Sequence, residues 1–404
     1  MDNKIHNILT SYINKLDSLI YSLPVVMESM NEDIVKGKLK FDKFIEDKVE
    51  KLEKKNDEDN QTYAIPIAYS KEFERQKQKL EHMSTAFDLL PKNFLVSFVS
   101  QYDSFLGDLN KELLVSKPEL FNNSDRELKF KDLIEFNTID DAREFLLEKE
   151  IETLLRKSHT EQFDWMINKF NLPLRKNLLI WKDFIEITER RNLFVHNNGT
   201  VSNQYIKVCN EHKVDISNIK VGDILTVSSV YLKNAYAVFY EIGFKLVQVL
   251  WRKLLPADLE SADTSLINIA YELLIHKKYT LSITLLDFAC DTLKNHNSDV
   301  NRRIMLVNRA LSYKLAGNNE KCISILNKED WSATGLNFQL AIAILQDKDK
   351  EVYQLMKNIG KDSQDFPSYV YGEWPLFEKY REKEDFKNIY KEIFNKELEL
   401  IERL

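Results

Sequence analysis

The scarcity of helix-breaking residues constrains this chain more than any other feature of its sequence. Only 9 glycines and 8 prolines interrupt 404 residues, whereas an average globular sequence holds about 7% glycine and about 5% proline. Leucine, lysine and glutamate, which lose little side-chain freedom in a helix, are abundant between these breaks. The sequence therefore predicts an all-α protein with long helices.

The net charge of the chain limits how it can bind nucleic acid. The net charge is −7, with 44% hydrophobic and 30% charged residues, which is typical of a soluble folded protein. A protein that coats nucleic acid needs a basic surface that displaces counterions from phosphates. Residues 151–220 hold 7 Lys and 4 Arg against 8 Asp and Glu, so any contact with nucleic acid is expected to be local.

Cysteine usage and hydropathy favour a cytoplasmic protein. Cys209, Cys290 and Cys322 lie far apart and form no CxxC pair, so neither a disulfide framework nor a zinc site is indicated. The first residues lack the apolar core of a signal peptide, and no apolar run approaches the ~20 residues of a membrane span. We expect no membrane segment and no cofactor.

Apolar spacing divides the chain into three expected domains. Residues 1–72 predict a helical arm, interrupted by the polar string 53–61, which predicts a loop. Residues 73–256 predict a helical bundle, and Pro256-Ala257-Asp258 predicts a hinge. Within the bundle the expected elements are a strongly apolar helix at 94–106, one long helix at 140–170, a helix that starts near Pro173, a helix resuming at 201–209, a turn or extended piece at 221–225 and a last helix at 228–255.

The third expected domain, residues 257–404, repeats one sequence pattern. An apolar helix, a short polar turn and a second apolar helix occur at 270–286, again at 310–326, and more weakly at 341–355. This pattern is similar to the tetratricopeptide repeat (TPR), although the spacing is irregular and the full consensus is absent. The resemblance implies an α-solenoid that could hold a protein or peptide partner.

One short segment carries the chemistry. Arg191 and His196 are five residues apart, Asn192 follows the arginine, and Asn197-Asn198-Gly199 favours the end of a helix. A histidine can transfer protons near neutral pH because its ordinary pKa is about 6.5. An arginine offers planar, permanently charged donors to phosphate oxygens. These residue types suit proton transfer beside a bound phosphate.

This segment resembles the Arg-x4-His signature of the HEPN superfamily, whose best-known members are metal-independent ribonucleases. The resemblance extends over about 85–255 and includes Phe184 to Asn192, Val201 and Tyr205. It implies catalytic Arg191 and His196, a supporting Asn192, and RNA contacts from Arg190, Asn197 and Lys207. It also implies a homodimer with a composite cleft, and products with 2′,3′-cyclic phosphate and 5′-hydroxyl ends.

Helix geometry restricts how Arg191 and His196 can act together. Residues i and i+5 of a regular helix diverge by about 140°, so Arg191 and His196 do not share one face. Either the helix end at Asn197-Asn198-Gly199 lets the histidine ring swing, or two copies meet at a two-fold axis. HEPN toxins with a nucleotidyltransferase antitoxin carry a tyrosine two residues after the histidine. Asn198 stands there, so modification at that tyrosine is not expected.

Other polar residues near the motif predict structural roles. His159 and His212 have polar sequence neighbours and are expected to be exposed. Glu186 and Glu189 are expected to pair with Arg190 or Lys182. The functional prediction is an endoribonuclease acting as a toxin or as an abortive-infection or antiviral defence effector, with the TPR-like region as its regulator. One alternative is a non-catalytic HEPN scaffold that dimerises or binds RNA and recruits a partner. Another is a helical structural protein in which the Arg-x4-His spacing occurs by chance.

Overall fold

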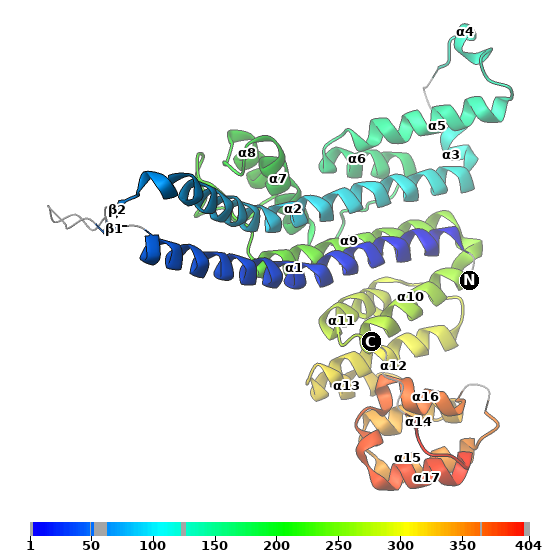
Figure 1. Cartoon of the computed structure of the whole chain (residues 1–404). Helices are drawn as coiled ribbons and strands as arrows, with labels where there is room; N and C mark the ends of the chain where they lie inside the picture. The colour runs from blue at the N-terminus through cyan, green and yellow to red at the C-terminus, as the bar shows by residue number, and fades with distance from the viewer. Residues whose placement is uncertain (1–2, 49, 52–62, 123–126, 364–365, 400–404) are drawn as a thin grey trace. The chain divides into compact units, whose positions relative to one another are not determined.

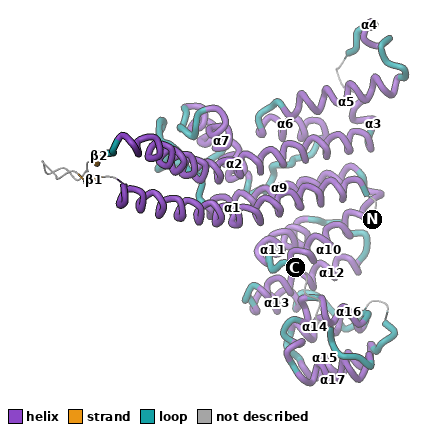
Figure 2. The backbone as a smooth tube through the Cα atoms, viewed as in Figure 1, coloured by secondary structure: helices purple, strands orange, loops and turns teal. Residues whose placement is uncertain are grey.

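The structure is a computed structural model that describes residues 3–48, 50–51, 63–122, 127–363 and 366–399. These residues are predominantly helical, as the scarcity of helix breakers predicts (Figures 1 and 2). The strands β1 (Glu50–Lys51) and β2 (Tyr63–Ala64) pair antiparallel. The polar string 53–61 lies outside the described residues. No helix in the described ranges combines the length and apolarity needed to cross a bilayer.

The helices follow in this order: α1 (Lys4–Lys48), η1 (Ile67–Tyr69), α2 (Ser70–Ser116), α3 (Pro118–Asn122), α4 (Phe130–Leu133), α5 (Ile139–Leu155), α6 (His159–Phe170), α7 (Trp181–His196), α8 (Asn203–Glu211), α9 (Ser229–Leu254), η2 (Pro256–Asp258), α10 (Leu259–Ile275), α11 (Tyr279–Asp287), η3 (Phe288–Thr292), α12 (Asp299–Leu315), α13 (Asn319–Leu326), α14 (Leu336–Leu345), α15 (Asp349–Ile359), α16 (Ser368–Glu373), η4 (Pro375–Phe377), η5 (Tyr380–Glu382) and α17 (Glu384–Phe394).

Contacts between residues divide the chain into two compact units. One unit is Asn7–Gly243, and the other combines Met1–His6 with Phe244–Leu404. Nearly all of α1 therefore belongs to the same unit as α2 and α7. The three ranges expected from the sequence do not follow this division, because the start of α1 contributes buried residues to the core of the Asn7–Gly243 unit.

Tyr12 shows how the core of the Asn7–Gly243 unit is built. Its ring is buried and stacks on Phe105 of α2 at 4.3 Å between centroids. Its hydroxyl donates to the backbone oxygen of Phe239 in α9 at 2.9 Å. A Cβ at Gly243 would lie 2.4 Å from the Tyr12 ring, so α9 needs a glycine there to approach α1. Figure 1 shows α1, α2 and α9 running alongside one another.

Two expectations for the middle of the bundle are wrong. Residues 140–170 form two helices, α5 and α6, because Ser158 begins a new helix. Its hydroxyl accepts a hydrogen bond from the Glu161 backbone, and the Glu161 carboxylate accepts from the Ser158 backbone, which is a capping box. Pro173 does not lie at a helix start, since turns fill 171–180 and α7 begins at Trp181. The helices expected at 201–209 and 228–255 are present as α8 and α9.

The other unit contains the expected helix pairs, and three of them turn in the same way. Lys277, Gly317 and Asp347 have positive φ values of 56°, 85° and 55°. In each turn the next residue's N–H donates to a carbonyl five residues back, at 2.8, 2.8 and 3.0 Å. This is the Schellman geometry that satisfies the last carbonyls of a helix. α10, α12 and α14 therefore lead into α11, α13 and α15 through equivalent turns.

Candidate active site

Helix α7 contains both Arg191 and His196, and it is continuous through the histidine, its last residue. The two side chains therefore diverge by about 140° within one chain. Arg191 is half-buried toward α2, whereas His196 is exposed. Within the described residues no group is hydrogen-bonded to the His196 ring. The helix ends after His196 rather than before it, so its end does not bring the two residues together.

The turn after His196 is fixed by backbone geometry. Asn198 and Gly199 have φ values of 48° and 80°. A Cβ at Gly199 would lie 2.9 Å from the Phe194 ring, so a side chain there would be both strained and crowded. The Asn197 amide donates to the backbone oxygen of Thr200 at 2.6 Å. The helix stop predicted from Asn-Asn-Gly is confirmed, and Asn197 has a structural role in it.

Arg191 shares the carboxylate of Asp103 with a buried histidine. Its Nη2 donates to Asp103 Oδ2 at 3.2 Å, and His159 Nε2 lies 3.0 Å from Asp103 Oδ1. Three helices thus meet here, since Asp103 belongs to α2, His159 to α6 and Arg191 to α7. The Nε of Arg191 is buried and has no hydrogen-bond partner among the described residues. The guanidinium is therefore held by one bond and retains unused donors.

Asn192 and Glu189 line the same side of α7. The Asn192 amide donates to Glu189 Oε1 at 3.3 Å. Burial raises the pKa of the Glu189 carboxyl, although His159, Asn192 and Arg191 act to lower this pKa. A carboxyl with a raised pKa beside an arginine is common at functional sites, although structural clusters also produce it. We call Asp103, His159, Glu189, Arg191 and Asn192 the Arg191 cluster.

Arg190 lies in a second cluster, which we call the Glu186 cluster. Glu186 accepts hydrogen bonds from Arg190 Nε at 2.7 Å, from the Tyr205 hydroxyl at 2.7 Å and from the Tyr231 hydroxyl at 2.6 Å. Arg190 also donates to the backbone oxygen of Thr226 at 3.0 Å and stacks on the Tyr231 ring at 4.3 Å. The pairing of Glu186 with Arg190 is present as predicted. Arg190, expected to contact RNA, has these structural partners.

Lys207 is separate from both clusters. It lies on α8 with 69% of its side chain exposed, and its Nζ is 4.0 Å from a carboxylate oxygen of Glu211. A pair this exposed contributes little to stability. Lys207 is therefore accessible to an anionic ligand, as an RNA contact would require.

Both histidines expected to be exposed are at least partly buried. His159 is 6% exposed, between the rings of Tyr102 and Phe184. His212 is half-buried and accepts a hydrogen bond at Nδ1 from the Trp181 indole at 3.1 Å. Since an indole N–H only donates, the neutral His212 ring carries its proton on Nε2, 3.2 Å from the Thr160 hydroxyl. Burial, and then the charge of Arg175, lower the pKa of His212.

Sequence reasoning missed Asp103 and His159. Asp103 is the only acidic residue in the apolar stretch 94–106. An isolated carboxylate in such a helix indicates that it has a polar partner on another helix. Ser158 and Glu161 have the spacing of a capping box, which marks a helix start immediately before His159.

Cysteine chemistry and metal binding find no support in the described part of the chain. Burial raises the pKa of Cys209 and Cys290 to about 12 and that of Cys322 to about 11, so none of the three forms a ready thiolate. No group of three or more histidine, cysteine, aspartate or glutamate side chains is placed to hold a metal ion among these residues.

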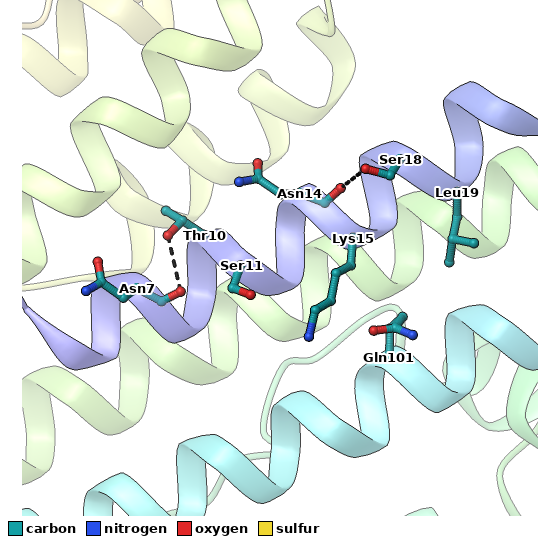
Figure 3. Close-up of a pocket in the computed structure, with 8 residues that line it drawn as sticks. All are labelled: Asn7, Thr10, Ser11, Asn14, Lys15, Ser18, Leu19 and Gln101. Atoms are coloured by element: carbon teal, nitrogen blue, oxygen red, sulfur yellow. Dashed lines mark hydrogen bonds between the residues drawn. The ribbon is translucent and has the colours of Figure 1, made fainter.

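Two hollows lie apart from the Arg191 cluster. One, of about 680 Å³, is shown in Figure 3 and is lined from α1 and α2 by Asn7, Thr10, Ser11, Asn14, Lys15, Ser18, Leu19 and Gln101. Its lining includes no carboxylate or imidazole. The other, of about 250 Å³, borders the Glu186 cluster, with Glu186 and Arg190 in its wall. Neither hollow supplies the acid–base groups that the motif predicts.

Comparisons of this chain with family models, with curated proteins and with solved structures found no match in any of the three. The chemistry is therefore argued from the site itself. One side of α7 offers an arginine with unused donors, and the end of the same helix offers an exposed imidazole. A phosphate oxygen would suit the first group, and proton transfer would suit the second.

Proposed function

We propose that the chain is a metal-independent endoribonuclease with a HEPN-like bundle, that it works as a homodimer, and that it acts as a toxin or defence effector. The observation that carries this proposal is the incomplete bonding of Arg191, whose buried Nε has no acceptor and whose Nη2 makes a single 3.2 Å bond. A buried donor without a partner is costly. A phosphodiester supplies several anionic oxygens that could satisfy this guanidinium.

The second group required is an imidazole that can reach the RNA. His196 is exposed at the end of α7 and lies directly after Val195, whose exposed fraction is 48%. Arg191 and His196 point apart within one chain, so we infer that His196 of one copy acts beside Arg191 of another. Asn192 would orient the substrate or Glu189.

The proposal is tested with purified wild-type, Arg191→Ala and His196→Ala proteins and RNA in EDTA. Wild type is expected to leave 2′,3′-cyclic phosphate ends, and each variant is expected to lose activity by about 10²–10³-fold, as when one transition-state donor is removed. Arg156→Ala is the control for a lost arginine, because its side chain is 76% exposed and belongs to neither cluster. Light scattering measures whether the chain is a dimer. A folded wild-type dimer that cleaves neither structured nor single-stranded RNA would overturn the proposal.

Mixed dimers test the composite site directly. Arg191→Ala and His196→Ala chains carrying different tags are co-expressed, and dimers that hold both tags are isolated. Each mixed dimer would contain one complete site, so about half of the wild-type activity is expected. Inactive mixed dimers alongside an active wild type would place both groups of one site within a single chain.

The rival proposal is a non-catalytic scaffold that binds RNA and recruits a partner. One observation favours it: Arg191 is bonded to Asp103 and only 19% of its side chain is exposed. RNA that is retained but never cut, with retention lost in Arg191→Ala, would support this rival.

We further propose that the second unit regulates the enzyme through a TPR-like surface. The three equivalent helix turns support a stack of helix pairs, which commonly forms a binding surface. Leu336 and Tyr369 are exposed there, at 40% and 57%. Leu336→Ser and Tyr369→Ser should leave RNA cleavage by the purified protein unchanged but alter its toxicity in cells. Unchanged toxicity in both variants would argue against this role.

A further inference from the structure

Asp103 is the only described residue that is hydrogen-bonded to the Arg191 guanidinium, and it is itself held by His159. The two carboxylate oxygens are divided between the two partners, with Oδ1 at 3.0 Å from His159 Nε2 and Oδ2 at 3.2 Å from Arg191 Nη2. The carboxylate therefore cannot turn toward one partner without loosening the other contact.

The His159 ring has little freedom to move. It is 6% exposed and lies edge-on to Phe184, with 5.6 Å between ring centroids. Tyr102, the sequence neighbour of Asp103, lies on another side at 6.1 Å. His159 is also the first residue of α6, directly after the capping box that fixes the helix start. A ring packed in this way holds the Asp103 carboxylate at a defined orientation.

We propose that Asp103 and His159 form a positioning pair that orients the Arg191 guanidinium toward the scissile phosphate, an inference that rests on the proposed ribonuclease function. Neither residue needs to touch the RNA. A guanidinium donates hydrogen bonds as a planar fork, so its value to a phosphate depends on the plane in which it is held. Arg191 has one bond to the protein, so the position of its Nη2 depends on Asp103.

The first test is a graded series at Asp103. Asp103→Ala removes the acceptor, and we expect kcat to fall about 10–100-fold, the scale of a misplaced catalytic group, while KM for RNA stays within about threefold. Asp103→Asn keeps a neutral acceptor and is expected to lie between Ala and wild type, because a charged acceptor binds more strongly. His159→Phe keeps the ring but removes its nitrogens, and a smaller loss of kcat is expected.

A double-mutant cycle separates positioning from general structural damage. Lysine at position 191 is a point charge without a plane to hold, so Asp103→Ala should cost at most about twofold in an Arg191→Lys background. Glu186→Gln is the matched control, because Glu186 is the carboxylate that binds Arg190. Its effect should add to that of Arg191→Lys. Equal losses from Asp103→Ala in both backgrounds would overturn the inference.

A spectroscopic measurement does not depend on cleavage. In protein labelled with ¹³C and ¹⁵N arginine, the Arg191 side-chain signals are assigned by their absence in Arg191→Lys. We expect slow guanidinium rotation in wild type and faster rotation in Asp103→Ala and Asp103→Asn, each with a wild-type helical circular dichroism spectrum. Unchanged rotation in both variants would contradict positioning by Asp103. If rotation is faster in the two variants but the wild-type protein never cleaves RNA, the contact between Asp103 and Arg191 stands. The ribonuclease function and the positioning step that rests on it would then be rejected.

Discussion

Arg190 and Arg191 are neighbours in sequence but belong to clusters that differ in how completely they are bonded. In the Glu186 cluster, a carboxylate accepts three hydrogen bonds, and Arg190 has a second acceptor in Thr226 and an aromatic ring against its plane. In the Arg191 cluster, the guanidinium has one bond and a buried Nε without an acceptor. Two arginines on one helix therefore differ in hydrogen bonding: Arg190 has several partners, whereas Arg191 has donors without acceptors.

This difference separates an arginine that stabilises the fold from one that is available to a ligand. When one partner of a fully hydrogen-bonded, buried ion pair is removed, the other charge is left without a partner and the folded state is strongly destabilised. Arg191 makes a single hydrogen bond to the protein, at 3.2 Å, so its removal breaks fewer contacts than removal of Arg190. Its unused donors are the groups that an anionic substrate could recruit. The comparison predicts that stability and activity depend on different members of this arginine pair.

The largest effect is expected from replacing the two arginines separately. Arg190→Ala leaves Glu186 without its cation and should cost about 3–5 kcal/mol in unfolding free energy. Arg191→Ala breaks one hydrogen bond to a charged group and should cost about 1.5–3 kcal/mol but remove RNA cleavage. Hydrogen exchange of the α7 amides measures the first quantity and RNA cleavage measures the second. Equal losses of stability in the two variants would end the distinction between the clusters.

The tyrosines of the Glu186 cluster give a smaller and more specific effect. Tyr231→Phe removes the hydroxyl that lies 2.6 Å from Glu186 Oε2 but keeps the ring against Arg190. Loss of a hydrogen bond to a charged group should cost about 1.5–3 kcal/mol. Tyr205→Phe removes the bond to Glu186 Oε1 and should cost a similar amount. Urea unfolding measures both.

Tyr231→Leu is the control, because it removes the ring as well as the hydroxyl. It should cost more than Tyr231→Phe, since the stacking on Arg190 is then lost too. If Tyr231→Phe were as stable as wild type, the hydrogen bond from Tyr231 to Glu186 would not contribute to holding Glu186 beside Arg190.

Local pattern was enough to predict much of the fold. The apolar spacing located α8 and α9, and Asn197-Asn198-Gly199 located the end of α7. The four-residue spacing of Glu186 and Arg190 predicted their pairing. These features depend on residues within one or two helical turns of each other, so the sequence carries them directly.

The Arg191 cluster could not be predicted in the same way. Asp103 is 88 residues from Arg191 and 56 from His159, and nothing local to any of the three specifies their meeting. His159 was expected to be exposed because its sequence neighbours are polar, but its burial is decided by the rings of Tyr102 and Phe184 from other helices. Periodicity describes which face of a helix is apolar, not which polar side chains meet across three helices.

The smallest expected effect concerns Glu189 and depends on pH. Burial raises the pKa of this carboxyl in the folded chain above its ordinary value of 4.5. The folded state therefore holds the proton to higher pH than the unfolded state, so stability falls as pH rises above the ordinary pKa, and the full cost is reached once pH exceeds the folded pKa. Glu189→Gln should give a small rise in thermal stability at pH 7 that disappears below about pH 4, measured by melting at a series of pH values.

Glu161 provides a control of opposite sign on α6. Hydrogen bonds from the Ser158 side chain and backbone lower the pKa of the Glu161 carboxyl, so its ionised form supports folding above the ordinary pKa. Glu161→Gln should therefore reduce stability at pH 7, and the loss should fade as pH falls through the folded pKa. If both variants shifted stability in the same direction at pH 7, Glu189 would not be a carboxylate held at a cost. Glu189 would then add nothing to the case for the Arg191 cluster as the active site, which would rest on the unpartnered Nε of Arg191.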